Sequence, residues 1–500
     1  MNSLLLYALW TAHLLTCRQA PAGAQLHIRL TSPVGSYASQ VGSAVHAVLI
    51  APLAVDGRTV LPMGATIDGG VVSVKRVGFG VVHETAALGL SFNTVTLPSG
   101  ESIPLAARIE QVDNARERIA RDGTIRGVRA TGSLCYRASG YIQAALKWEI
   151  HAEVAEWFFR AFIVQLPEPE IYFPPGVEMT LALREPLLVN TPDSDLNART
   201  PALADNERVD LEPLLDQLPV RAQSMNGRPS DLMNVLFIGD REQLARAFEA
   251  AGWVEPQRVT MRSRIRDIRA VAERAGYRHA PMSPMFVNDA RPGMAWEKGF
   301  NDLSKRDHIR IWKQPETWRG QEIWMGAATR DLNFAYFRPG QMLTHRVEKN
   351  IDEERDKVVN DLAFASCADA VGWLDREQGL REAYNATGDP MTTDARVAVV
   401  RLNDCREPRF AIESDPVTLA PHGGKMQRFA RREVLAMRDD LLRTNMYYRI
   451  YEGTRMAVEA IVRRYRGRSG GLASARVDGR AGTLASARAA TARAPAAGLR

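Results

Sequence analysis

Residues 25–190 carry the hydrophobic pattern of β-strands. Apolar and polar positions alternate in five segments that are rich in Val, Ile and Thr: VHAVLIAPL, TIDGGVVSVKRV, LGLSFNTVTL, IPLAARIEQV and VEMTLALREPLLV. Alternation with a period of two places the apolar side chains on one face of a sheet. We therefore predict a mostly β domain over this range.

Three turns between these segments share one pattern, in which a Pro stands two residues before a Gly. They lie at 61–64, 97–100 and 173–176. Pro presets its own φ, and Gly supplies the positive φ that the end of the turn requires. A turn of this kind, used three times to open a strand, predicts a small antiparallel barrel or sandwich. One amphipathic helix over 141–165 interrupts it, and its aromatic stripe fits either core packing or a surface for a partner or membrane.

Residues 225–403 mix strand and helix patterns and predict an α+β domain. NVLFIG at 234–239 has the composition of a strand, and the following DREQLARAFEAAGW has the pattern of a helix. Asp240 is expected to cap this helix, with Gln243 as the reciprocal partner three residues later. The segment contains no Gly-rich phosphate-binding loop, so we do not expect a nucleotide site.

The segment RDHIRIW predicts a strand with two different faces. Ile309 and Ile311 fall on one face, which we assign to the core, and His308, Arg310 and Trp312 fall on the other. Residues on one face of a strand repeat at about 7 Å. This row of an imidazole, a guanidinium and an indole suits recognition of an anion or a ring. The alternative is a solvent-facing strand with its Trp half buried against a loop.

Two further segments add an acid and a second imidazole. EIWMGAATRD predicts a strand with Asp331 at its end, where loops commonly build sites, and MLTHR supplies His345. His308, Asp331 and His345 fit either a metal set of two His and one carboxylate or general acid/base catalysis. Their spacing is irregular and matches no fixed metal motif. We expect no cofactor and keep a divalent metal as the alternative.

The chain from Ile351 has the spacing of an amphipathic helix. Ile351, Val358, Val359 and Leu362 define its buried stripe, and Arg355 falls on the same stripe. The positive charge of a buried guanidinium at this position must be compensated by a nearby group.

An unpaired buried charge is costly, so Arg355 is expected to meet a carboxylate or an anionic ligand. Asp331 and Asp352 are the candidate carboxylates, and we count Asp352 with Arg355 among the ligand-binding candidates. The alternative is a structural ion pair, or an Arg at the edge of the stripe whose guanidinium reaches solvent.

The charge distribution excludes one class of partner. The 500 residues carry a net charge of +6, but nine Arg and one Asp in residues 461–500 give that segment +8 and leave −2 for the rest. A nearly neutral body does not support nucleic-acid binding, which requires a basic face on a folded domain. From residue 467 the chain is rich in Ala, Arg and Gly with little apolar bulk, which predicts a disordered tail.

The N-terminus has the pattern of an export signal. An apolar run ends before Ala22-Gly23-Ala24, which fits cleavage after residue 24. Cys17 follows Leu-Leu-Thr and loosely matches a lipidation site, which offers a route to membrane association. Cys367 and Cys405 lie in one region and fit either a disulfide formed in an oxidising compartment or two buried free thiols.

The predicted fold is multi-domain, with an all-β barrel or sandwich and one helix, then an α+β domain. The predicted parts are a signal peptide at 1–24, the β domain at 25–190, a linker at 191–224, the α+β domain at 225–403, a helical extension at 404–466 and a disordered tail at 467–500.

The second domain resembles a known bacterial family. NVLFIGDREQLARAFEAAGW, AGYRHAPMSPMFVN, HIRIWKQ, EIWMGAATRD, THR, IDEERDKVVNDL and NATGDPMTTDARVAVVRL are similar to motifs of the LssY C-terminal domain. Members commonly have a double His where this chain has Asp307-His308, and often a further His or Lys where it has Arg346. Elsewhere the domain is joined to integral-membrane modules of the phosphatidic-acid-phosphatase and DedA types, which implies envelope or lipid-related biology.

The turns of the first domain resemble those of the outer-ring barrel of conjugation and type IV secretion systems. The phrases LPMGATIDGGVV, SFNTVTLPSGESIPL and FPPGVEMTLALREPL carry this resemblance. It implies an envelope scaffold barrel and brings no catalytic motif.

These observations support two hypotheses. The first is an exported envelope or periplasmic protein whose LssY-type domain binds an anionic small molecule, a lipid headgroup or another envelope protein. The second is a hydrolase acting on phosphoester or lipid-related substrates, with His308, His345 and Asp331 as catalytic groups and Arg310 or Arg355 holding the anion. The second hypothesis requires His308 and His345 to lie close together in the fold.

Overall fold

The computed structural model describes residues 17–78, 85–130, 166–190, 201–337, 342–405 and 424–447, with single residues outside these ranges. Residues up to Arg432 belong to one compact unit, and Glu433–Arg500 belong to a second.

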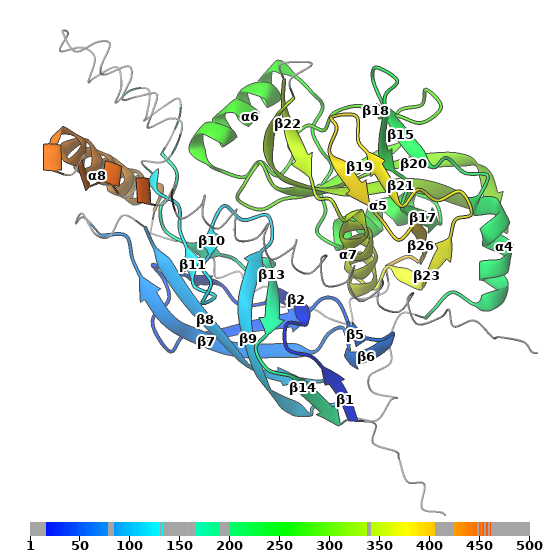
Figure 1. Cartoon of the computed structure of the whole chain (residues 1–500), viewed down its shortest axis with the longest axis horizontal. Helices are drawn as coiled ribbons and strands as arrows, with labels where there is room; N and C mark the ends of the chain where they lie inside the picture. The colour runs from blue at the N-terminus through cyan, green and yellow to red at the C-terminus, as the bar shows by residue number, and fades with distance from the viewer. Residues whose placement is uncertain are drawn as a thin grey trace, which may run out of the picture. The chain divides into compact units, whose positions relative to one another are not determined.

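Six antiparallel strands of the first compact unit close into a barrel (Figure 1). They are β2 (Gln25–Leu30), β4 (Ala44–Leu49), β7 (Thr66–Lys75), β8 (Ala87–Thr96), β9 (Ser102–Val112) and β13 (Glu178–Leu183). The order is β8-β7-β4-β2-β13-β9, and β9 pairs back with β8. Of the two predicted architectures, the barrel is confirmed.

Short strands decorate the barrel. They are β10 (Arg118–Ile119) and β11 (Ile125–Arg126) beside β8, β1 (Cys17–Ala20) paired with β14 (Leu187–Asn190), β3 (Val34–Gly35) with β12 (Tyr172–Phe173), and β5 (Leu53–Val55) with β6 (Arg58–Leu61). Strand β1 lies inside the predicted leader, so cleavage after residue 24 would remove it.

The predicted turns have the expected backbone geometry. Gly64, Gly100 and Gly176 have φ values of 87°, 91° and 93°, in the region that a Cβ disfavours. The amide of Gly100 donates to the carbonyl of Leu97 over 2.8 Å and closes its turn. The Pro-x-Gly spacing therefore fixed these strand starts locally.

A mixed seven-stranded sheet follows the barrel in sequence. Its strands, in order, are β19 (Met294–Lys298), β20 (Arg306–Trp318), β21 (Gln321–Phe337), β17 (Val235–Ile238), β26 (Arg396–Leu402) and β23 (Ala368–Asp375), with β22 (Met342–Val347) also paired to β21. Only the β17–β26 pair is parallel among the described pairs of this sheet. Together with its helices, this sheet confirms the predicted α+β class.

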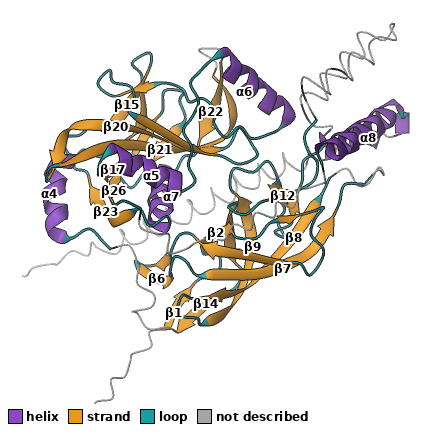
Figure 2. Cartoon of the chain, turned by 180° about the vertical axis from the view of Figure 1, so that it is seen from behind, coloured by secondary structure: helices purple, strands orange, loops and turns teal. Residues whose placement is uncertain are grey.

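Helices cover both faces of this sheet. Figure 2 shows α5 (Arg241–Ala250) and α7 (Ile351–Phe364) against β17 and β26. The opposite face packs against α4 (Asp205–Leu215) and a small sheet of β16 (Pro229–Leu232), β15 (Arg221–Ser224) and β18 (Met285–Phe286). A further helix, α6 (Met261–Glu273), and the hairpin of β24 (Glu382–Tyr384) and β25 (Pro390–Thr392) complete the domain.

Local predictions in this domain are confirmed. Asp240 caps α5 by accepting from the amide of Gln243 over 2.7 Å, and the Gln243 side chain accepts from the Asp240 amide over 3.1 Å. Ile309 and Ile311 are buried in the core under α5 and α7. The four apolar residues predicted to form the inner stripe of α7 are all buried.

Part of the stretch predicted as a linker is structured. Residues 201–224 contain α4 and β15, because Leu203, Leu211, Leu215 and Leu218 supply an apolar face that packs on the sheet. The predicted helix over 141–165 and the predicted tail fall almost entirely outside the described residues. The helical extension begins with α8 (Lys425–Thr444).

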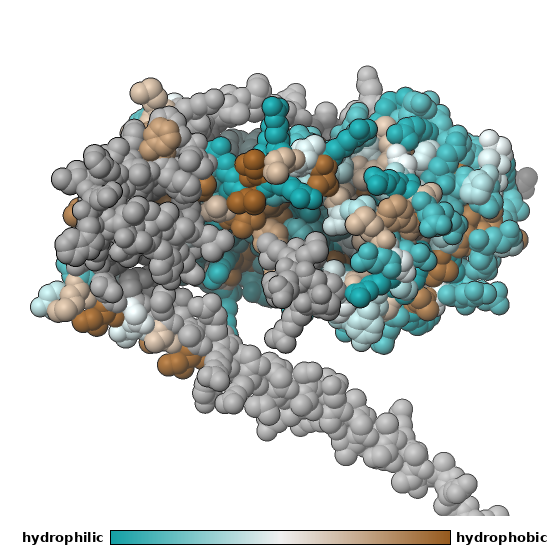
Figure 3. Space-filling view, turned by 90° about the horizontal axis from the view of Figure 1, so that it is seen from above, coloured by the Kyte–Doolittle hydropathy of each residue, from teal (hydrophilic) through white to brown (hydrophobic). Residues whose placement is uncertain are grey.

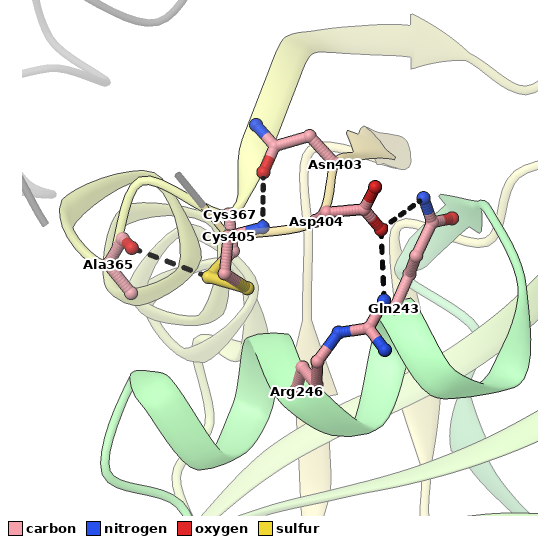
Figure 4. The surroundings of a disulfide bond; sticks show 7 residues. All are labelled: Gln243, Arg246, Ala365, Cys367, Asn403, Asp404 and Cys405. Atoms are coloured by element: carbon pink, nitrogen blue, oxygen red, sulfur yellow. Dashed lines mark hydrogen bonds and ion pairs between the residues drawn. A yellow bond between two sulfur atoms is a disulfide. The ribbon is translucent and has the colours of Figure 1, made fainter. Parts of the chain in front are cut away.

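Cys367 and Cys405 form a disulfide, which settles the alternative that the sequence left open. It joins the start of β23 to the residue that follows β26 closely in sequence. Figure 4 shows the neighbouring Asp404 bonded to Gln243 and Arg246 of α5, at 3.2 and 2.9 Å. Among the described residues, no helix has the length and apolar character to span a membrane.

Candidate functional site

The register of three neighbouring strands gathers charged groups on one face of the sheet. Glu297 of β19 stands opposite His308 of β20, which stands opposite Thr329 of β21. One row away, Arg306 stands opposite Asp331. Directly paired residues in antiparallel strands point to the same face, so these five side chains face one another across three strands.

The three predicted catalytic residues come together on this face. The Nδ1 atom of His308 lies 3.8 Å from Oδ2 of Asp331, and Nδ1 of His345 lies 3.4 Å from the same oxygen. Strand β22 delivers His345, whose ring packs against Phe334 with centroids 4.7 Å apart. Asp331 sits within β21 rather than at its end, which corrects the predicted placement, because this strand continues to Phe337.

Arg306 completes the group, and the sequence interpretation missed it. Its guanidinium lies 2.9 Å from Glu297 and 3.5 Å from Asp331. The signal was present, because Arg306 precedes His308 by two residues and therefore shares its face of β20. Arg306, His308, Asp331 and His345 are called the imidazole cluster below.

Burial controls the protonation of these side chains. Desolvation lowers the pKa of His308 to about 3 and the pKa of His345 to about 4, so both imidazoles are neutral at pH 7. Desolvation also raises the pKa of Glu297 to about 8, against the opposing effect of Arg306. The cluster therefore holds a permanent guanidinium and two neutral rings.

Three nitrogen atoms of the imidazole cluster lack a hydrogen-bond partner among the described residues. They are Nδ1 of His308, Nδ1 of His345 and Nε of Arg306. The two Nδ1 atoms lie 3.8 and 3.4 Å from Oδ2 of Asp331 without forming a hydrogen bond, and Arg306 reaches that oxygen through Nη2 instead of Nε. Nε2 of His308 lies 2.9 Å from the Thr329 hydroxyl, and when it accepts that proton its Nδ1 becomes a donor. Unpartnered buried polar nitrogens are unusual and suit a hydrogen-bond partner supplied from outside the chain.

The described side chains can also be examined for the predicted alternative of a divalent metal. Within the described ranges, no group of three or more His, Cys, Asp and Glu side chains has an arrangement that could hold a metal ion. In the imidazole cluster the Nδ1 atoms of His308 and His345 lie 3.8 and 3.4 Å from the same carboxylate oxygen of Asp331.

Arg310 and Trp312 are buried on the same face of β20 as His308. Arg310 contacts Asp231 of β16 at 3.3 Å, and the Trp312 indole donates to the Ala290 carbonyl over 3.1 Å. Trp312 belongs to the core under α4. The alternative of a solvent-facing strand with a half-buried Trp is wrong, because α4 and the small β16-β15-β18 sheet cover the strand. Recognition of an anion or a ring by Arg310 and Trp312 stays a prediction.

Arg355 is enclosed by carboxylates at the start of α7. It lies 2.7 Å from Asp394, 2.8 Å from Asp356 and 3.2 Å from Asp352. Asp352 was a predicted partner, whereas Asp394 comes from the loop before β26 and was missed. This arrangement matches the structural ion-pair alternative, and a ligand-binding role of Arg355 and Asp352 stays a prediction.

The opposite face of the sheet carries a second set of charges. There, Lys298 and Arg330 flank Asp307 across β19, β20 and β21. Asp307 is buried and accepts from Asn114 over 2.9 Å. This position therefore serves a contact between the sheet and the segment that follows β9.

A buried ion network joins this face to the barrel. Glu178 of β13 contacts Arg29 of β2 and Lys298, each at 2.7 Å, and also pairs with Lys357 of α7. Asp361 of α7 contacts Lys298 at 2.9 Å and Arg29 at 3.3 Å. We call these five residues the barrel-to-sheet network.

A cavity of about 550 Å³ lies beside this network, between α7 and the barrel. Acidic side chains outnumber basic ones on its walls, and Glu353, Glu354 and Asp356 of α7 are among them. The walls of this cavity would therefore repel an anion.

Substituting His308 by Gln should reduce the loss of stability on acidification. The folded ring stays neutral down to about pH 3, whereas an unfolded His takes up a proton below about pH 6.5. Protons therefore favour the unfolded state, and stability falls from about pH 6.5 towards pH 3, approaching about 1.4 kcal/mol per pH unit for this group.

Urea denaturation at several pH values between 7 and 4.5 would measure the two slopes. Glu297 has the opposite dependence, because its raised pKa makes stability fall as pH rises from about 4.5 to about 8. Glu297 is present in both the wild type and the His308→Gln variant, so its contribution to the pH dependence cancels when the two slopes are compared. Parallel curves for wild type and variant would show that His308 is not held neutral by burial.

Comparison with known proteins identifies one domain. Residues 215–397 match the family model described as LssY C-terminus, which confirms the predicted resemblance over that stretch. Among solved structures, ComB10 of the Com type IV secretion system of Helicobacter pylori matches with 12% identity and a TM-score of 0.20, over 35% of this chain and 92% of that one. A comparison with curated proteins found no significant match.

Proposed function

We propose that the LssY-type domain binds an anionic group with several acceptor oxygens, of the phosphate class, at the imidazole cluster. The observation that carries this proposal is the set of three unpartnered nitrogen atoms around Asp331. Arg306 supplies a fixed positive charge, and a guanidinium matches the geometry of a phosphate. Because burial keeps the rings neutral, each ring has one N–H donor to offer and adds no charge until an anion arrives.

Asp331 has a positioning role in the proposed site. Its carboxylate lies next to Arg306 and to both rings, and so holds the donors in place when no ligand is present. An entering anion would compete with it for the same donors. The affinity for a phosphate group is therefore expected to be moderate and to rise as pH falls, since protonated rings bind an anion more strongly.

The test is binding of inorganic phosphate and phenyl phosphate to the full chain, measured by calorimetry at pH 7. His345→Gln should weaken binding about tenfold or more, as expected for loss of one hydrogen bond to a charged group. His46→Gln is the matched control, because His46 pairs with Asp68 at 2.6 Å on the barrel, outside the cluster. Equal losses in the two variants, or no binding by the wild type, would contradict the proposal.

A second candidate function is hydrolysis of the bound phosphoester. It is favoured by the meeting of two imidazoles at one carboxylate, an arrangement in which one ring can take up a proton while Asp331 orients it. The same variants decide it with a chromogenic phosphomonoester. Turnover by the wild type that falls about a hundredfold in His308→Gln would support it. Binding without turnover would leave the domain a receptor.

We further propose that the protein is exported to the cell envelope. The Cys367–Cys405 disulfide supports this location, because such bonds persist in oxidising compartments. The predicted signal peptide is the second support.

A further inference from the structure

Helix α6 presents its apolar side chains outward. Met261, Ile265 and Ile268 are 73%, 58% and 69% exposed, whereas Ser263 and Ala270 are buried. Residues three and four positions apart share one face of a helix, so the three apolar residues form one stripe. Ser263 and Ala270, seven residues apart, lie on the opposite side. The helix therefore packs on its small residues and leaves its large apolar residues outside.

The helix is well defined at its start, so this orientation is not a frayed end. Thr260 caps it by accepting from the Ser263 amide over 3.1 Å, and the Ser263 hydroxyl accepts from the Thr260 amide over 2.9 Å. Val259, just before the cap, is also exposed. Figure 3 shows hydrophobic residues among hydrophilic ones on the face of the molecule seen from above.

Basic residues flank the stripe. Arg264 lies on one side of it, and Arg262 and Arg269 lie on the other, as the helical repeat of 3.6 residues requires. Residues 255–279 contain seven Arg against three acidic residues. Arg269 pairs with Glu273 at 2.6 Å, and Arg266 donates to Gln257 over 3.1 Å. The surroundings of the stripe keep a positive balance after these contacts.

We propose that α6 lies on an anionic lipid bilayer, with Met261, Ile265 and Ile268 inserted between the headgroups. An apolar stripe flanked by Arg is the pattern of an interfacial helix: the side chains insert at the acyl boundary and the guanidinium groups stay at headgroup level. Charge complementarity selects the occupant, since each Arg near an anionic bilayer adds favourable attraction.

A protein partner fits this surface less well. A stable protein interface buries about 800 Å² on each side and has few charges at its centre, whereas this stripe is one helix wide and has Arg on both sides. A bilayer accepts a narrow stripe because it has no fixed shape to complement.

The opposite side of α6 faces the imidazole cluster. Ala270 packs with Leu303 and with Phe334, whose ring contacts His345. Docking of α6 would therefore place the cluster close to the membrane surface. The proposal does not depend on the cluster binding an anion, because vesicle binding is measured without any ligand for the cluster.

The test is co-sedimentation of the full chain with vesicles of phosphatidylcholine alone and of phosphatidylcholine mixed with phosphatidylglycerol. The wild type should prefer the anionic vesicles and lose binding as salt rises. The variant Ile265→Gln/Ile268→Gln should bind about tenfold more weakly, because two inserted side chains are lost. Val209→Gln is the matched control, since Val209 is an equally exposed apolar residue on α4.

A second pair of variants tests the charge. Arg262→Gln/Arg264→Gln should weaken binding to anionic vesicles several-fold and leave binding to phosphatidylcholine nearly unchanged. Arg228→Gln, at an exposed position on another part of the domain, is the control. The nine Arg of residues 461–500 are present in every variant, so their attraction to lipid cancels in the comparison.

The proposal is overturned if the Ile265→Gln/Ile268→Gln variant binds anionic vesicles as the wild type does. It is also overturned if the wild type binds no vesicles, and self-association that is lost in the same variant would show that the stripe contacts a second copy of the chain instead. Because Met261, Ile265 and Ile268 are exposed, the variants should keep the wild-type unfolding midpoint, which separates lost binding from lost folding.

Discussion

Replacing Glu178 with Ala is expected to lower the free energy of unfolding by about 3–5 kcal/mol. Glu178 is buried on β13 and compensates three cations, namely Arg29, Lys298 and Lys357. Burial by itself would raise the pKa of Glu178, but these cations hold it well below its usual value. Without the carboxylate, the cations keep their desolvation cost and share Asp361 as the remaining partner in the barrel-to-sheet network.

Denaturant titration followed by tryptophan fluorescence measures this effect. Asp404→Ala is the control, because the Arg246–Asp404 pair is solvent-exposed and its loss should cost about 1 kcal/mol or less. The isosteric Glu178→Gln separates charge from volume and should cost nearly as much as Glu178→Ala. If Glu178→Ala is no more destabilising than Asp404→Ala, the network does not hold the barrel and the sheet together.

Loss of the Cys367–Cys405 disulfide has the second largest expected effect. Cys405→Ser should destabilise the protein by about 2–4 kcal/mol, because a link across 38 residues restricts the unfolded chain. The loop that it closes contains β23 and β26, which pair at the edge of the sheet. Cys405 is the better position to change, since Cys367 is fully buried and Ser there would place a polar hydroxyl in the core.

Unfolding with and without reductant checks this expectation. Dithiothreitol should bring the wild type down to the stability of Cys405→Ser and leave the variant unchanged. Alkylation of protein isolated from the periplasm of a bacterial host, without reductant, should leave both cysteines unlabelled once the protein is unfolded. Full labelling of Cys367 and Cys405 there would contradict the disulfide, and absence of the protein from the periplasm would contradict the proposed export.

Local patterns determined much of the fold. The alternating segments became barrel strands, and the Pro-x-Gly turns took positive φ at Gly64 and Gly100, because backbone sterics act within a few residues. The capping pair of α5 and the inner stripe of α7 were equally readable, since helix periodicity and end capping depend on neighbours three and four residues apart. The sequence also named His308, Asp331 and His345 as candidates by their chemistry.

Only the tertiary structure decided which of these groups meet. Strand register placed Arg306 opposite Asp331 and brought His345 to the same carboxylate, and register depends on pairings that no local pattern contains. The partners of Arg355, the disulfide and the barrel-to-sheet network likewise join residues far apart in sequence. The sequence by itself determined the helices and strands and the kinds of charged and polar side chains that they carry. Packing of the sheet, the helices and the barrel determined which charges are buried, how they are compensated and which nitrogen atoms stay available to a ligand, because desolvation depends on the surrounding fold.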